Sequence, residues 1–133
     1  MLPFSVPFKP GLSVHEQVVF AVKKACVAGQ LRPGDAFPSV RALSQQLRIN
    51  PHTAHKVVAT LVGQGLLEVR PGIGTVVARA PAATRAQRRA LLEEETGRLV
   101  VEARKLSLDL ESVLEAVEEQ WKRLDAERVV PSP

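Results

Sequence analysis

Residues 38–61 read PSVRALSQQLRINPHTAHKVVATL, and this stretch predicts two short helices joined by a tight turn. Ser39 is a favourable N-cap, because its hydroxyl can accept a hydrogen bond from an amide of the first helical turn. The apolar residues that follow have helical spacing and form one stripe: Val40, Leu43 and Leu47. The pattern therefore predicts a helix that begins at Ser39 and ends before Arg48.

The turn contains Asn50-Pro51, which starts the second helix of the stretch. Proline disfavours the helical conformation for the residue before it, yet it suits the first position of a helix. We therefore expect Asn50 to cap a helix over residues 51–64. Its inward face is predicted to comprise Ala54, Val57, Val58 and Leu61.

A further helix is predicted on the N-terminal side, over residues 13–29, after an extended lead rich in proline and glycine. Ser13 and Glu16 have the spacing of a capping box, in which each side chain bonds the other residue's amide. Gly29 is a favourable end for this helix. Cys26 falls on the apolar face, so we expect a core thiol rather than a redox sensor.

A β-hairpin is predicted on the C-terminal side, with strands at 66–70 and 75–79 and a glycine-rich turn at 71–74. Three helices followed by a hairpin are the order of a winged helix-turn-helix, whose third helix would enter the major groove of DNA. The hairpin tip would lie against the DNA backbone or in the minor groove. Glycine at the tip permits the tight turn and leaves no side chain to block that approach.

Charge is distributed unevenly along the 133 residues. Residues 1–80 hold nine Lys/Arg against three Asp/Glu, a net of +6, whereas residues 81–133 hold nine against eleven, a net of −2. The basic part suits a polyanion such as nucleic acid. One cysteine excludes an internal disulfide, and no apolar run approaches the roughly 18 residues of a membrane span. The N-terminus lacks signal-peptide features, so we expect a cytoplasmic protein.

Two more helices are predicted after Thr84, over about 84–106 and from about Leu110 onwards, with Asp109 as the cap of the second. Each carries a heptad-like apolar seam, which two copies could bury together as a four-helix bundle. The expected dimerisation residues are Leu92, Leu99, Leu106, Leu110, Leu114, Val117, Trp121 and Leu124.

The predicted fold class is therefore mainly α with a small β-hairpin. A winged helix-turn-helix over 1–79 and a linker over 80–83 precede an antiparallel two-helix hairpin over 84–128 that forms a dimer bundle, and 129–133 are expected to be a flexible tail. A helical hairpin this short offers little room for an enclosed ligand pocket of several hundred Å³.

The sequence resembles the GntR family of bacterial transcription regulators over about residues 12–79. The segments that carry the resemblance are 16–18, 29–35, 38–43, 50–53, 65–67 and 72–75. The short tail, in particular residues 102–108, is similar to the YtrA-like subfamily. The resemblance implies a cytoplasmic homodimer that binds a pseudo-palindromic operator, usually as a repressor. It also implies a target operon beside or encoding an ABC-type transporter, and it leaves open an unidentified small-molecule effector.

The expected contacts to DNA gather at the helix starts and the hairpin tip: Ser39, Arg41, Asn50, His52, Thr53, His55, Lys56, Gly72 and Gly74. The Arg41 guanidinium suits a phosphate or the edge of guanine, with a surface salt bridge as the alternative. The resemblance implies that Arg41 touches DNA and that Thr53 binds phosphate. Ser39 could present its helix terminus to phosphate or only cap it. His55 stands where the family often has arginine, and Lys56 is either a phosphate contact or a solvated lysine.

Other function classes find little support in the sequence. His52 and His55 are spaced closely enough to share a metal, but no third ligand is well placed, so we expect no metal or other cofactor. No nucleophile–base set or phosphate-cradling loop indicates an enzyme. The main alternative to a sequence-specific regulator is a winged-helix module that binds DNA non-specifically or binds protein.

Overall fold

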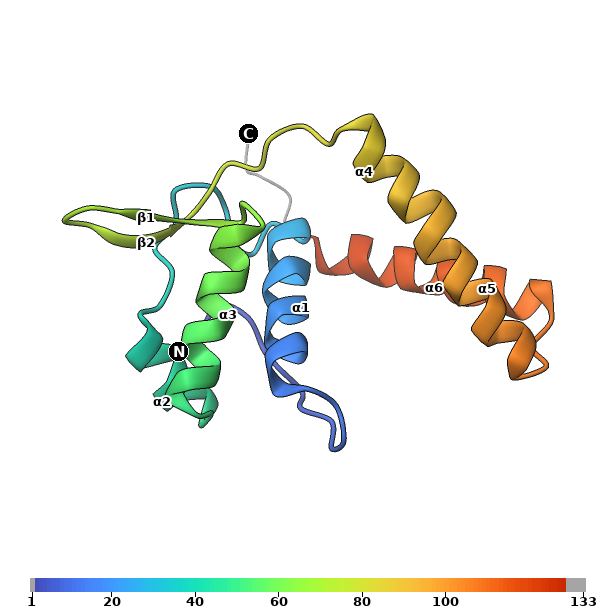
Figure 1. Ribbon diagram of the computed structural model, residues 1–133, viewed down its shortest axis with the longest axis horizontal. Helices are drawn as coiled ribbons and strands as arrows, with labels where there is room; N and C mark the ends of the chain where they lie inside the picture. The colour runs from blue at the N-terminus through green and yellow to red at the C-terminus, as the bar shows by residue number, and fades with distance from the viewer. Residues whose placement is uncertain (1, 129–133) are drawn as a thin grey trace. The chain divides into compact units, whose positions relative to one another are not determined.

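The helices and strands of the chain follow the predicted order (Figure 1). The computed structural model describes residues 2–128, which divide into two compact units: residues 2–80 together with Arg128, and Pro81–Glu127. The first unit contains α1 (Val14–Val27), α2 (Val40–Leu47), α3 (Pro51–Gly63), β1 (Leu67–Arg70) and β2 (Gly74–Val77). This arrangement confirms the predicted winged helix-turn-helix. The tail predicted over 129–133 lies outside the described residues.

Side-chain caps start the three helices of the first unit, as predicted. Ser39 Oγ accepts from the Ala42 amide at 3.1 Å, and Asn50 Oδ1 accepts from the His52 amide at 2.8 Å. Ser13 Oγ accepts from the Glu16 amide at 3.2 Å. The reciprocal half of the predicted capping box was wrong: in the described structure the exposed Glu16 carboxylate makes no bond to the Ser13 amide, and it remains solvated.

The core of the first unit lies where the three helices meet. Its largest fully buried side chains include Val18 and Val22 of α1, Leu43 of α2, and Val57 and Leu61 of α3. The apolar stripes predicted for α2 and α3 therefore do face inward. Because both helices are packed against the same core, their N-terminal turns are held in fixed positions.

Both β-strands are shorter than predicted, and they gain a neighbour that the sequence did not reveal. Leu67 pairs with Val77 and Arg70 with Gly74 in an antiparallel register. On the other side of β2, Ala36 forms an isolated bridge with Val76. Next to that bridge, the Phe37 amide donates to the Thr75 carbonyl at 2.9 Å. The loop before α2 is thus tied directly to the hairpin.

The N-terminal lead is packed onto the first unit rather than merely extended. The ring of Phe4 is buried and stacks on that of Phe37, with centroids 6.0 Å apart. Gln17 of α1 fixes the next part of the lead, because its amide group donates to the carbonyls of Lys9 and Leu12 and accepts from the Lys9 amide.

The second unit contains α4 (Arg85–Arg89), η1 (Ala90–Glu95), α5 (Thr96–Lys105) and α6 (Leu110–Glu127). Thr84 caps α4 through a capping box with Gln87. The segment η1 is π-helical, a feature that we did not predict. A π turn holds more residues than an α turn. The side chains before it are therefore rotated about the helix axis, away from the positions that a regular α-helix would give them in the predicted seam.

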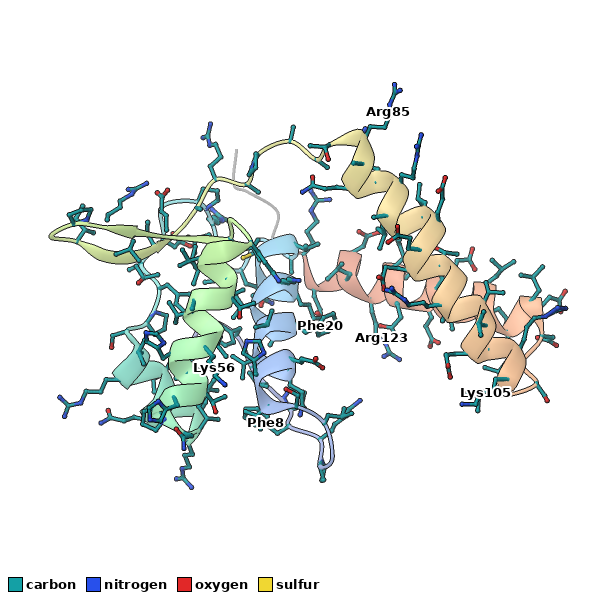
Figure 2. The ribbon with its side chains drawn as sticks, in the orientation of Figure 1. Phe8, Phe20, Lys56, Arg85, Lys105 and Arg123 are labelled. Carbon is teal, nitrogen blue, oxygen red and sulfur yellow. The ribbon has the colours of Figure 1, made fainter. Side chains whose placement is uncertain are left out.

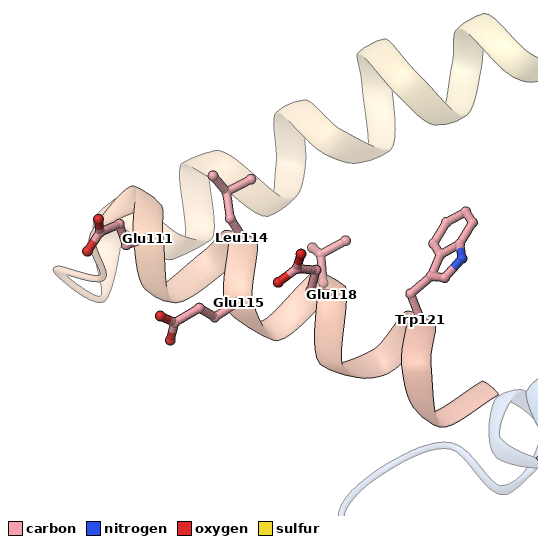
Figure 3. Close-up of a pocket in the computed structure, with 6 residues that line it drawn as sticks. Glu111, Leu114, Glu115, Glu118 and Trp121 are labelled. Carbon is pink, nitrogen blue, oxygen red and sulfur yellow. The ribbon is translucent and has the colours of Figure 1, made fainter. Parts of the chain in front are cut away.

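The helices α5 and α6 run in opposite directions but diverge from the turn that joins them (Figures 1 and 3). Asp109 caps α6 as predicted, with Oδ1 accepting from the Ser112 amide at 2.8 Å. Hydrogen bonds from Ser112 hold the pKa of the Asp109 carboxyl below its ordinary value. Among the described residues of this unit, only Ala103 is buried. Most of the large apolar side chains of the unit are therefore exposed.

Candidate nucleic-acid interface

The N-terminal half of α3 presents polar and basic side chains on one face. His52, His55 and Lys56 lie close together on the helix, and all three are exposed, as is the cap Asn50. Figure 2 labels Lys56 on α3. Thr53 is half-buried beside them. Imidazole, ammonium and amide groups can donate hydrogen bonds to base edges and phosphates. This face therefore has the chemistry that a recognition helix requires.

The start of α2 adds a second cluster. Ser39 caps the helix, and its hydroxyl already accepts from the Ala42 amide, which supports the capping role. Arg41 is exposed in the first turn, and no carboxylate among residues 2–128 pairs with its guanidinium. The alternative of a surface salt bridge thus has no partner within the described chain. The guanidinium is available for bidentate binding to an external acceptor.

The three acids of the first unit do little to offset its positive charge near these helix starts. Asp35 Oδ2 accepts from the Arg32 amide at 2.9 Å within its own turn. Glu68 pairs with Arg70 along β1 at 2.7 Å. Glu16 lies in the first turn of α1. None of the three belongs to α2 or α3, so both helices carry only basic charges.

The hairpin tip has the backbone that its glycines permit. Gly72 and Gly74 have φ angles of +77° and +112°, which L side chains rarely adopt. A Cβ added at either position would meet no atom within 4 Å, so conformation rather than crowding calls for glycine here. The tip thus offers bare backbone on both sides of Ile73, whose amide donates to the Arg70 carbonyl at 3.0 Å.

Two supporting features of the interface were missed. His15 Nε2 and Thr60 Oγ1 share a hydrogen bond of 2.8 Å that joins α1 to α3. Arg48 ends α2 with a left-handed φ of 55°, and Ser44 Oγ bonds the Ile49 carbonyl in the same turn. Ser44 lies close to Ile49 in the sequence, so a local pattern could have indicated the contact in the turn. His15 and Thr60 are 45 positions apart, so no local pattern could have indicated theirs.

No histidine or cysteine site for a metal was found in the part of the chain that the structure describes. His15 is engaged by Thr60, so it does not complete a set with the two histidines of α3. Cys26 is half-buried against the core, and burial raises the pKa of its thiol. A raised pKa disfavours the reactive thiolate, which agrees with the expected structural role.

The expected dimerisation residues are exposed, except for Leu124, which is half-buried. Trp121 is the most exposed of them, at 72%. An open groove of about 560 Å³ runs along α6, and Figure 3 shows the side chains that line it: Glu111, Leu114, Glu115, Val117, Glu118 and Trp121. It lies on the surface of one helix, with an apolar floor and an acidic edge.

Comparison with known proteins agrees with this geometry. Residues 14–77 match the family described as bacterial regulatory proteins, gntR family. The HTH-type transcriptional repressor YtrA of Bacillus subtilis is 29% identical over 107 residues, which cover 80% of this chain and 82% of that protein. No helix of the described residues is long and apolar enough to cross a membrane.

Two solved structures share the fold. A transcriptional antiterminator from Listeria monocytogenes superposes with a TM-score of 0.84 at 22% identity, over 97% of both chains. YtrA from Sulfolobus acidocaldarius, a GntR-family transcription factor, gives a TM-score of 0.51 at 18% identity, over 90% of this chain and 97% of that one. The tail helices are therefore part of a fold that occurs in other proteins.

Proposed function

Since residues 14–77 belong to the gntR family of bacterial regulatory proteins, we propose that this transcriptional regulator is a homodimeric repressor of a pseudo-palindromic operator. The observation that carries the proposal is the exposed polar face at the starts of α2 and α3, whose charged residues are all basic. Repression is the activity named for YtrA of Bacillus subtilis, to which the chain is similar over four fifths of its length. The proposed target is an operon that encodes an ABC-type transporter.

In this proposal α3 enters the major groove with His52 and His55 towards the base edges. Arg41 reaches a guanine edge or a phosphate, while Lys56 and Thr53 bind phosphates and fix the register of the helix. Ser39 and Asn50 start the two helices and aim their free amides at the backbone. Gly72 and Gly74 let the hairpin tip approach the duplex.

A second copy of the chain is the proposed partner of the tail. An isolated tail leaves Leu114, Val117 and Trp121 in water, and burial of such side chains is the main driving force for association. Two copies related by a two-fold axis would cover these surfaces and place two α3 helices on successive major-groove sites. That arrangement requires an operator with two similar half-sites.

Charge along the tail is complementary between α6 and the run of helices α4, η1 and α5. That run carries basic Arg85, Arg88 and Arg89, then acidic Glu93, Glu94 and Glu95, and, after Arg98 and Glu102, basic Arg104 and Lys105. From its N-terminus, α6 alternates in the opposite sense: Glu111, Glu115, Glu118 and Glu119 are acidic, Lys122 and Arg123 basic, and Asp125 and Glu127 acidic. Because a basic–acidic–basic order reads the same in both directions, these blocks support pairing of the helices in either direction, and they contribute little to stability.

A regulator of this kind works where the chromosome is, so we place it in the cytoplasm. The alternative is a winged-helix module that coats DNA non-specifically or binds protein. Specific and non-specific DNA binding both predict affinity that falls with salt, because phosphate contacts release counterions. Only the repressor predicts that one sequence is preferred over others.

The test is binding of the full chain to the upstream region of its own gene, measured by fluorescence anisotropy at about 150 mM salt with excess unrelated duplex. Saturation at two protomers per site, with binding that survives the competitor, would support the proposal. If the excess of unrelated duplex abolishes binding to the upstream region, the non-specific module is favoured. Light scattering of the free protein tests the dimer separately.

A further inference from the structure

Ile73 occupies an unusual position for an apolar side chain. It lies at the tip of the hairpin between Gly72 and Gly74, and it is 72% exposed. Its amide closes the turn by donating to the Arg70 carbonyl, so the backbone is fixed while the side chain projects. Single exposed apolar residues are common on protein surfaces, so exposure alone does not indicate a binding role. The two neighbouring glycines, however, leave no side chain beside it that could cover it.

The chemistry of the tip selects one surface of DNA over another. Phosphate is bound by cations and N–H donors, and the isoleucine side chain offers neither. The nearest cation in the hairpin, Arg70, is already paired with Glu68 through both Nε and Nη2. The side chain at the tip is therefore poorly suited to the charged backbone. It is better suited to the sugar edges and base steps that line a groove.

We infer that Ile73 inserts into the minor groove of the operator as an apolar wedge; this inference rests on the proposed function. The minor groove, about 6 Å wide, admits a single side chain at the end of a narrow hairpin, and α3 is proposed to occupy the major groove. Apolar side chains that enter this groove, isoleucine among them, partly unstack a base step and bend the duplex. The bend depends on how easily that step deforms, so Ile73 contributes to sequence preference without a hydrogen bond.

The inference predicts that the tip contributes an apolar contact to DNA binding and not an ionic one. Loss of an apolar contact lowers affinity but leaves the number of neutralised phosphates unchanged. Replacing Ile73 with serine should therefore weaken binding without changing the dependence of log Kd on log salt. The expected weakening is about tenfold, which corresponds to removing one buried aliphatic side chain from the complex.

The experiment compares Ile73→Ser with Val69→Ser in the full chain. Val69 is 64% exposed on β1 of the same hairpin, so its replacement removes a similar side chain away from the tip. Affinity and its salt dependence are measured by anisotropy, and DNA bending by energy transfer between dyes at the two ends of the operator duplex. We expect Ile73→Ser to lose affinity and bending, and Val69→Ser to retain both. Circular dichroism melting confirms that each variant is folded.

A second variant distinguishes the backbone from the groove. Ile73→Lys should bind less well and bend less if the wedge is correct, because a solvated ammonium cannot unstack a base step as isoleucine does. If instead Ile73→Lys binds more tightly with a steeper salt dependence and bends the duplex as much as the unaltered chain, no wedge at the tip causes the bend and the inference is overturned. Wild-type affinity and bending in Ile73→Ser would overturn it too. Failure of the proposed function would look different, since the unaltered chain would then show no preference for its operator.

Discussion

The rings of Phe4 and Phe37 stack with centroids 6.0 Å apart and planes inclined by only 8°. This contact joins the N-terminal lead to the loop whose next residues start α2. Phe37 also donates its amide to Thr75 of β2, so one residue connects the lead, the hairpin and the start of α2. The lead is therefore a structural part of the DNA-binding unit.

Replacing Phe4 with alanine should destabilise the first unit by about 3 kcal/mol, because it removes a buried aromatic ring and leaves a cavity. Phe8→Ala is the control, since Phe8 is 40% exposed and is expected to cost less than about 1 kcal/mol (Figure 2). Urea unfolding at one fixed protein concentration measures both. Equal stability of the two variants would contradict the packing described for the lead.

Arg41→Ala should weaken operator binding by about 1–3 kcal/mol, roughly 5- to 150-fold, if the guanidinium forms a bidentate bond with a base. The same change should relax discrimination at one base pair of each half-site. Lys23→Ala is the control, because Lys23 is an exposed basic residue of α1 outside the proposed interface. Anisotropy titrations with single-base operator variants measure both effects. Unchanged affinity and discrimination would remove Arg41 from the interface.

Lys56→Ala should weaken binding to all duplexes to a similar degree. A lysine that contacts phosphate carries no sequence information, so its loss should lower the salt slope by about one without changing base preference. The measurement is affinity for operator and for unrelated duplex over a series of salt concentrations. A changed base preference with an unchanged slope would instead indicate that Lys56 reads a base.

Trp121→Ala should raise the dimer dissociation constant by at least about tenfold, since a large exposed aromatic is the kind of residue that dominates an interface. Operator binding should then require a higher protein concentration, while the melting of the first unit stays the same. Analytical ultracentrifugation measures the dissociation constant, with Phe8→Ala again as the control. A dimer of unchanged strength would show that α6 is not at its centre.

Acid should weaken the start of α6. Hydrogen bonds from Ser112 lower the pKa of Asp109, so its contribution to stability is present above about pH 4, the value in the unfolded chain, and is lost as the pH falls through the lower folded value. Asp109→Asn keeps a good N-cap but cannot titrate. Helicity of the variant should therefore depend less on pH than that of the unaltered chain, as measured by circular dichroism between about pH 2 and 6. Equal pH dependence would show that the Asp109 cap does not contribute.

Sequence alone was sufficient for features determined within a few residues. The caps at Ser39 and Asn50, and the proline after Asn50, act on adjacent amides, so their types and spacing predict where α2 and α3 begin. The inward-facing apolar stripes of α2 and α3 could be predicted for the same reason, because helical spacing is a local pattern. Most of the expected DNA contacts depended on the family resemblance, and they remain predictions until operator binding is measured.

Features that depend on distant partners were missed. No sequence pattern around Phe4 indicates that its ring stacks on Phe37. His15 can bond Thr60 only when α1 and α3 have packed together. The π-helical turn at Ala90–Glu95 has no strong local signal, because no proline or glycine interrupts that segment. The divergence of α5 from α6 reflects how a whole helix surface is packed, which a heptad pattern does not specify.

The bridge between Ala36 and Val76 also bears on aggregation. It gives β2 a backbone neighbour on both sides, so β1 has the only free edge among the named strands of the described chain. An open strand edge invites pairing with other molecules, and short length and charge are the usual protection against it. β1 has only four residues, two of them the ion pair Glu68 and Arg70. The sheet therefore offers little edge for pairing with another molecule, whereas many of the exposed apolar residues of the described chain lie on the tail helices.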